Sequence, residues 1–123
     1  MAESSRPERL SDAEIEQALE SVPGWMVQRG KLHREFRFQN FNQAFGFMTR
    51  AALCSETMNH HPEWSNVYAT VVVDLVTHSA DGITNLDFSL AKQMNAIVDE
   101  CSRRKDALRN GALRSLSPVS QHN

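Results

Sequence analysis

KLHREFRF, at residues 31–38, alternates polar or charged side chains with apolar ones, and its largest apolar residues are Leu32, Phe36 and Phe38. A period of two is typical of a β-strand that has one buried face. Residues 25–28 and the dipeptide Arg29-Gly30 precede this strand and complete the pattern of a β-hairpin. The sequence therefore predicts an antiparallel sheet that begins at this hairpin.

The hydrophobic period changes after this strand. Residues 42–59 carry apolar side chains at helical spacing, namely Phe47, Ala51, Cys54 and Met58, joined by Phe45, Met48 and Ala52. This spacing predicts the main helix of the protein, with a wide apolar stripe. Because Pro62 disfavours helical geometry at His61, we expect the helix to end there.

Shorter signals predict the elements on either side. Ser11 and Glu14 form a capping-box pattern at the start of a short helix, whose inward residues are Ile15, Ala18 and Leu19 and which ends before Pro23-Gly24. Residues 67–78 are rich in β-branched residues and predict one long strand, or two shorter strands with a bend near Ala69-Thr70. Its inner face would be Val71, Val73, Leu75 and Thr77.

A turn at Asp81-Gly82 leads into the last predicted helix. Thr84 is its expected N-cap and Asp87 its N3 residue. Its predicted inner face is Leu86, Leu90, Met94, Ile97 and Cys101. The basic run Arg103-Arg104-Lys105 is expected after this helix, where positive charge suits the helix dipole.

The order of these elements predicts an α+β fold in which an antiparallel β-sheet has three helices packed on one face. The expected domain covers residues 10–105. Residues 1–9 are predicted to be a flexible N-terminal tail, and residues 106–123 a flexible C-terminal extension.

Composition limits the possible functions. The chain has 123 residues, of which 41% are hydrophobic, so it is long enough for one core and too short for two. The formal net charge of −2 gives no reason to expect direct nucleic-acid binding. Cys54 and Cys101 fall on apolar stripes, which indicates free thiols. With neither a leader nor a membrane span predicted, we expect a cytoplasmic protein.

Three histidines are the candidate acid/base groups, because imidazole exchanges protons near neutral pH. His60 lies four residues after Glu56, so we expect that carboxylate to orient it. His61 is expected to point in another direction, which allows a second contact to one substrate. His78 ends the predicted strand before the turn, at a place where sites are commonly built.

Several of these residues have a simpler structural explanation. Asp87 could serve only the helix cap, and Trp64 and Tyr68 could serve only packing. We assign His33, which alternates with charged residues on an outward strand face, no role. Zinc is an alternative for the histidines, but adjacent ligands are unusual because metal-binding pairs are mostly four apart on helices or two apart on strands. We therefore expect no metal.

One part of the sequence resembles the signature of the pterin-4a-carbinolamine dehydratase family. It combines the block HHP-x-W-x-N-V-Y at residues 60–68, the dipeptide Thr77-His78, and Asp87 at the start of the last helix. The order of elements agrees with the family from roughly Leu10 to Arg104. Some relatives carry a basic residue immediately before this aspartate, but here Leu86 stands at that position. A charge contact to the substrate from that position is therefore not expected.

The resemblance implies the same fold and a reaction without metal or cofactor. Water is removed from 4a-hydroxytetrahydrobiopterin to give the quinonoid dihydropterin, which recycles the cofactor of aromatic amino-acid hydroxylases. It also implies roles for six residues: His60, His61 and His78 as catalytic residues, Glu56 and Asp87 as orienting or secondary acid/base groups, and His61 with Trp64 as substrate-binding residues.

The resemblance implies partners besides the pterin substrate. Members of the family form oligomers, so we expect a homodimer or homotetramer. Some animal members also act as a dimerisation cofactor of a homeodomain transcription factor, which makes a protein-binding coactivator the alternative function.

Overall fold

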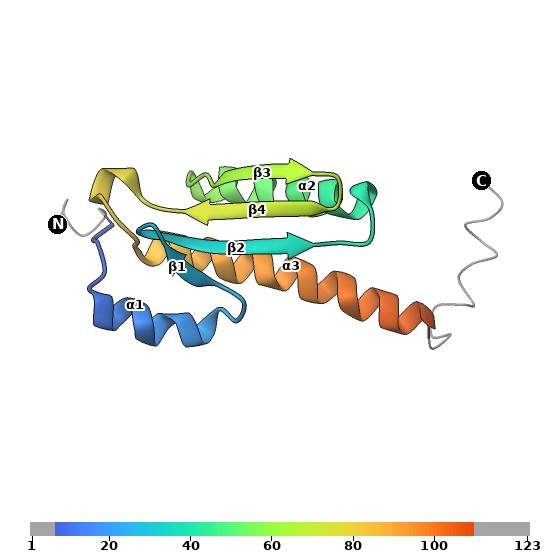
Figure 1. The fold of residues 1–123 in the computed structure, drawn as a ribbon, viewed down its shortest axis with the longest axis horizontal. Helices are drawn as coiled ribbons and strands as arrows, with labels where there is room; N and C mark the ends of the chain where they lie inside the picture. Colours follow the sequence, from blue (N-terminus) through green and yellow to red (C-terminus); the bar gives the residue numbers. More distant parts are fainter. Residues whose placement is uncertain (1–6, 110–123) are drawn as a thin grey trace.

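The computed structural model describes residues 7–109, with side chains described as far as Ser102. Figure 1 shows the fold, whose elements in chain order are α1 (Asp12–Ala18), η2 (Leu19–Ser21), β1 (Met26–Gln28), β2 (Lys31–Arg37), α2 (Phe41–Met58), β3 (Glu63–Val67), β4 (Thr70–Leu75), η3 (His78–Ala80) and α3 (Asn85–Arg109). The predicted α+β class is confirmed. No helix in this described part is long and apolar enough to cross a membrane.

The sheet is antiparallel and has the strand order β1-β2-β4-β3. The predicted hairpin at Arg29-Gly30 is confirmed, with both residues at positive φ. The alternative of one long strand over residues 67–78 is wrong. The chain reverses at Tyr68, whose φ is 50°, and β3 and β4 pair as a hairpin from Glu63 opposite Asp74 to Val67 opposite Thr70.

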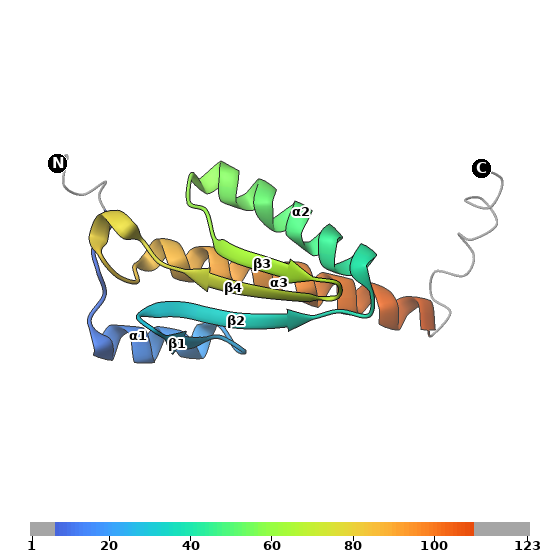
Figure 2. The same cartoon turned by 45° about the horizontal axis from the view of Figure 1, so that its top comes forward.

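One face of the sheet is buried beneath the helices. Figure 2 shows the strands in front with α3 running behind them. Residues of β2 and β4 on this face, such as Leu32, Phe36 and Val73, are almost fully buried and join Phe47 of α2 and Leu90 of α3 in one core. Burial of this kind stabilises by about 25 cal/mol per Å² of apolar surface and holds the helices against the sheet.

The helix α2 is only partly covered by the rest of the chain. Its buried residues are Ala44, Phe47, Ala51 and Ser55. The predicted stripe was too wide, because Ala52 is exposed and Phe45 is 54% exposed. Phe41 and Leu53 are also exposed large apolar residues on α2. This helix therefore presents an apolar surface that the single chain does not bury.

The last helix begins as predicted but extends further. Thr84 Oγ1 accepts from Leu86 N, and Thr84 N donates to Asp87 Oδ2, which confirms the predicted cap. The predicted burial of Cys101 is wrong, since this residue is exposed near the end of the packed region. The run Arg103-Arg104-Lys105 lies inside α3 and does not follow it, because α3 continues to Arg109.

The start of the described chain is attached to the turn after β4. Leu10 N donates to Ile83 O at 2.9 Å, and Arg9 Nη1 donates to Asp81 O at 3.3 Å. The capping box of Ser11 and Glu14 at α1 is confirmed. Residues 1–6 of the expected tail and residues 110–123 of the expected extension lie outside the described residues.

Candidate active site

The end of α2 determines where the two adjacent histidines point. Asn59 adopts the left-handed conformation, with φ 54° and ψ 43°. His60 N donates to Ser55 O and Asn59 N donates to Glu56 O, which is the Schellman arrangement of a helix C-terminus. The helix therefore ends at Asn59, three residues before Pro62. His60 and His61 follow a left-handed turn and no longer keep helical directions.

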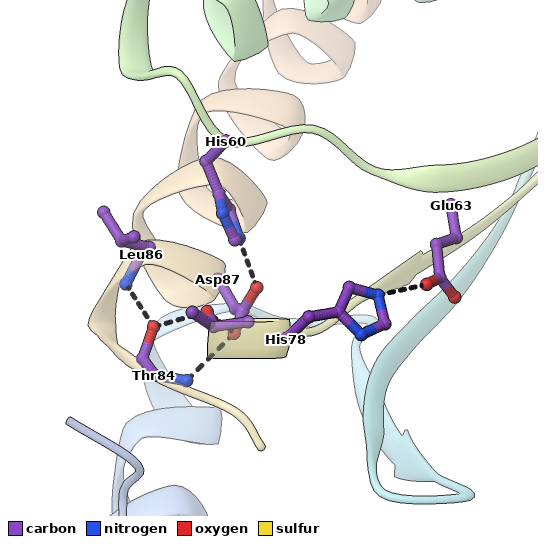
Figure 3. A network of polar contacts seen from close by, with 7 residues as sticks. His60, Glu63, His78, Thr84, Leu86 and Asp87 are labelled. Atoms are coloured by element: carbon purple, nitrogen blue, oxygen red, sulfur yellow. Dashed lines mark hydrogen bonds and ion pairs between the residues drawn. The ribbon is translucent and has the colours of Figure 1, made fainter. Parts of the chain in front are cut away.

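His60 points inward and binds Asp87. The side chain of His60 is 9% exposed and that of Asp87 is fully buried. His60 Nε2 lies 2.6 Å from Asp87 Oδ1, as Figure 3 shows. This contact connects the segment that follows α2 to the first turn of α3. A buried carboxylate in the first turn of a helix is favoured by the helix dipole.

Asp87 is held by two further donors. Its Oδ2 accepts from Thr84 N and from Thr77 Oγ1, both at 2.9 Å. The Thr77 hydroxyl donates its only proton to Asp87. In the 2.7 Å contact between the two threonine hydroxyls, Thr84 Oγ1 must therefore be the donor and Thr77 Oγ1 the acceptor. Asp87 thus serves the helix cap and His60 at the same time, so the two explanations for this residue do not exclude each other.

His61 points outward and binds the carboxylate that was expected to orient His60. The distance from His61 Nε2 to Glu56 Oε1 is 2.8 Å, and the His61 side chain is 56% exposed. The predicted pair of Glu56 with His60 is therefore wrong. The four-residue rule requires both residues on one helix, and the left-handed turn at Asn59 removes His60 from it.

His78 is the most exposed of the three histidines. It begins η3, its side chain is 78% exposed, and its Nε2 lies 2.8 Å from Glu63 Oε2 (Figure 3). Lys31 Nζ donates to the other oxygen of Glu63 at 2.5 Å. The hydrogen bonds from Lys31 and then His78 lower the pKa of the Glu63 carboxyl below its ordinary value. Glu63 is consequently an ionised acceptor at neutral pH.

All three histidines share one arrangement. Each places Nε2 within 2.6–2.8 Å of a carboxylate oxygen from Asp87, Glu56 or Glu63. An ionised carboxylate only accepts hydrogen bonds, so Nε2 carries the hydrogen in each pair and Nδ1 remains the second ring nitrogen for proton exchange. An imidazole oriented by a carboxylate is a common arrangement in general acid–base catalysis.

Two residues of this network were not predicted from the sequence as site residues. Thr77 was placed on a buried strand face and in the family signature without a role of its own, although a hydroxyl among valines and leucines is a sign that it has a buried partner. Glu63 could have been found only from the pairing of β3 with β4, which places it at the sheet end near His78. His33, to which no role was assigned, also binds a carboxylate, with 2.8 Å to Asp74.

Trp64 and Tyr68 take no part in these pairs and differ in their exposure. Trp64 is half-buried on the inner side of β3 and packs against the core. Tyr68 is 65% exposed at the β3–β4 turn. Within residues 7–109, no group of three or more His, Cys, Asp or Glu side chains is arranged to hold a metal ion.

The structure is thus an α+β protein with three histidine–carboxylate pairs. A family model described as pterin 4 alpha carbinolamine dehydratase matches residues 8–97. Since this match covers most of the chain, the protein belongs to the pterin-4a-carbinolamine dehydratase family, as the sequence resemblance predicted.

Individual relatives agree with this assignment. A provisionally named pterin-4-alpha-carbinolamine dehydratase of Solibacter usitatus is 55% identical over 90 residues, which are 73% of this chain and 95% of the relative. A protein with the same provisional name from Chelativorans sp. is 55% identical over 91 residues, covering 72% of this chain and 93% of the relative. A solved structure, the transcriptional coactivator/pterin dehydratase of Brucella melitensis, is similar with a TM-score of 0.71 and 47% identity, covering 73% of this chain and 98% of that one.

Proposed function

We propose that the protein is a hydro-lyase that dehydrates a 4a-hydroxytetrahydropterin to the quinonoid dihydropterin. The observation that carries this proposal is the buried contact of His60 with Asp87, in a family named for this reaction. A fully buried carboxylate with three donors keeps one imidazole at a fixed position and in one tautomer. Such a pre-positioned imidazole is what proton transfer to a bound substrate requires.

The reaction needs two proton transfers and no change in oxidation state. A base removes the proton from ring N5, and the N5 electron pair forms a double bond to C4a. The C4a–O bond breaks as an acid protonates the hydroxyl, which leaves as water. We assign these transfers to His60, oriented by Asp87, and to His78, while His61, oriented by Glu56, mainly binds the substrate with Trp64.

A dehydration assay with synthetic 4a-hydroxytetrahydropterin tests the proposal. Replacing His60 or His78 by alanine is expected to lower kcat by about 10²-fold, the smaller end of the range for one acid/base group, because this reaction also proceeds without a catalyst. His61→Ala should mainly raise KM. Glu35→Gln is the control, since it removes an exposed ion pair with Arg37 on β2 that involves none of the three histidines. A wild-type rate no faster than buffer would overturn the proposal.

The proposed physiological role is recycling of tetrahydrobiopterin. The substrate is the hydroxylated pterin left by a pterin-dependent aromatic amino-acid hydroxylase, so deleting the gene should matter only when such a hydroxylase is active. Growth that depends on the hydroxylation product, compared in cells with and without the gene, measures this role. Equal growth under those conditions would contradict it.

The second candidate function is binding of a protein partner through α2. Phe41, Phe45 and Leu53 on this helix are 47%, 54% and 66% exposed, and exposed apolar groups of this size usually mark an interaction surface. We propose that this surface forms the homodimer or homotetramer, and that a transcription factor is the alternative occupant. The related Brucella melitensis protein is named both a transcriptional coactivator and a pterin dehydratase.

Light scattering on the purified protein separates these possibilities. Phe45→Glu is expected to reduce the mass of an oligomer formed through α2, and Glu35→Gln on the sheet is its control. A monomeric wild type would contradict the oligomer. Copurification of a transcription factor, combined with absence of dehydration, would favour the coactivator function.

A further inference from the structure

We propose that Glu63 is the positioning residue of His78 and that Lys31 holds Glu63 in place for this task. The inference rests on the proposed function, because it gives a role to a residue next to one of the proposed proton carriers. Glu63 is not among the residues for which the sequence predicted a role. It is the first residue of β3, directly after the His60-His61-Pro62 segment.

The two oxygens of Glu63 have different partners. Oε2 lies 2.8 Å from His78 Nε2, and Oε1 accepts from Lys31 Nζ at 2.5 Å. Lys31 belongs to β2 and Glu63 to β3, and β4 separates these strands in the sheet. The Lys31 side chain therefore reaches across the end of β4 to bind Glu63. Three elements, β2, β3 and η3, meet in this group of charges.

His78 needs such a partner more than His60 does. The His60 ring is almost fully enclosed, so packing and Asp87 fix it together. The His78 side chain is 78% exposed, so packing does little to select one ring orientation. The contact with Glu63 supplies that orientation and keeps the hydrogen on Nε2, so that Nδ1 faces away from the carboxylate.

The other charged groups near Glu63 belong to the neighbouring strands. Asp74 of β4 lies opposite Glu63 in the register, and His33 of β2 binds Asp74 at 2.8 Å. Desolvation opposes the ionisation of Glu63, whereas its bonds to Lys31 and His78 favour it. Lys31 thus keeps Glu63 available as an acceptor for His78. If Lys31 and Glu63 formed only a surface ion pair, removing that pair would leave the ring orientation of His78 unchanged.

A carboxyl ¹³C NMR titration of the full chain tests the arrangement without any substrate. In wild type, Glu63 should titrate below its ordinary pKa because of its bonds to Lys31 and His78. Lys31→Met and His78→Ala should each raise the pKa of Glu63 towards its ordinary value, whereas Arg37→Met, which removes the exposed ion pair with Glu35, should not. Identical Glu63 titration in wild type and both test variants would overturn the proposal.

A double-mutant cycle tests the positioning role in the assay. Glu63→Gln is expected to lower kcat by about tenfold with little change in KM, which is less than the loss for removing a proton carrier itself. In the His78→Ala background the same change should have no further effect, and Glu35→Gln should have none in either background. Equal losses from Glu63→Gln with and without His78 would overturn the inference.

The two experiments separate this inference from the proposed function. If wild type does not dehydrate the pterin, the proposed function fails, and the titration alone decides whether Glu63 binds and orients His78. If wild type is active but Glu63 titrates independently of His78 and Lys31, the proposed function stands and the inference fails.

Discussion

His60 Nε2 lies 2.6 Å from Asp87 Oδ1, although the two residues are 27 positions apart in the sequence. Both side chains are buried, and the contact connects the chain after α2 with the first turn of α3. Because Asp87 also accepts from Thr77 and Thr84, a change at this carboxylate affects a helix cap and an imidazole together.

Asp87→Asn is expected to lower kcat by about 10²-fold. The amide oxygen can keep the bonds to Thr77 and Thr84, but the NH₂ group then faces the Nε2–H of His60. Two facing donors displace the imidazole or reverse its tautomer. The unsatisfied buried group should also lower the free energy of unfolding by about 1–3 kcal/mol. Dehydration kinetics and urea unfolding measure the two effects. Asp12→Asn, which alters an exposed carboxylate in the first turn of α1, is the control and should leave kcat unchanged.

Asn59→Val is expected to lower the free energy of unfolding by about 1–2 kcal/mol, because a β-branched residue is disfavoured at the left-handed conformation of this position. It should also reduce dehydration, since continuing the helix would carry His60 away from Asp87. Asn59→Gly should preserve both properties. The matched control is Asn42→Val, on an exposed position of α2 with ordinary helical conformation. Equal unfolding curves for Asn59→Val and Asn59→Gly would contradict this explanation.

Gly82→Ala is expected to displace Arg9, because a Cβ atom at residue 82 would lie 2.3 Å from Arg9 Cδ and 2.6 Å from Arg9 Cγ. The hydrogen bond from Arg9 to Asp81 O would be lost with it, at a cost of about 0.5–1.5 kcal/mol. In an Arg9→Ala background the added methyl group meets no such obstacle, so the cost of Gly82→Ala should disappear. Urea denaturation of the four proteins measures this coupling, and additive effects would refute it.

Stability should depend on pH through Glu63. Its folded pKa is lowered below the usual 4.5 by the bonds from Lys31 and His78. A lowered carboxyl pKa contributes stability that is fully present above the unfolded pKa and is lost as the pH falls through the folded pKa. Lys31→Met should therefore have a lower Tm than wild type at neutral pH, and the difference should shrink below pH 4.5. A difference that stays constant down to acid pH would argue against this linkage.

Much of the fold followed from local patterns. The alternation in residues 31–38 and the helical spacing in residues 42–59 predicted β2 and α2 to within one or two residues, because burial on one face imposes these periods directly. The capping box at Ser11 and the cap at Thr84 were correct for a similar reason, since each needs only residues within one helical turn. The β3–β4 hairpin was harder, because its turn at Tyr68 has no glycine to mark it.

The contacts between the candidate site residues were predicted only in part. His60, His61, His78, Glu56 and Asp87 all take part in histidine–carboxylate pairs. The wrong pairing of Glu56 with His60 arose because the helix was expected to include His60 and to end at His61. A single left-handed residue ends it at Asn59, and asparagine is among the few residues that adopt this conformation readily. The partner of His78 depends on strand register, which no local pattern specified.

The left-handed turn at Asn59 also gives two residues that share a peptide bond very different mutational freedom. In a library randomised at both positions, selection for folding alone should restrict residue 60 to side chains that satisfy the buried Asp87, while residue 61 should tolerate almost any substitution. Residue 61 is thus the place where directed evolution could adapt the protein to pterins with new substituents without rebuilding its interior.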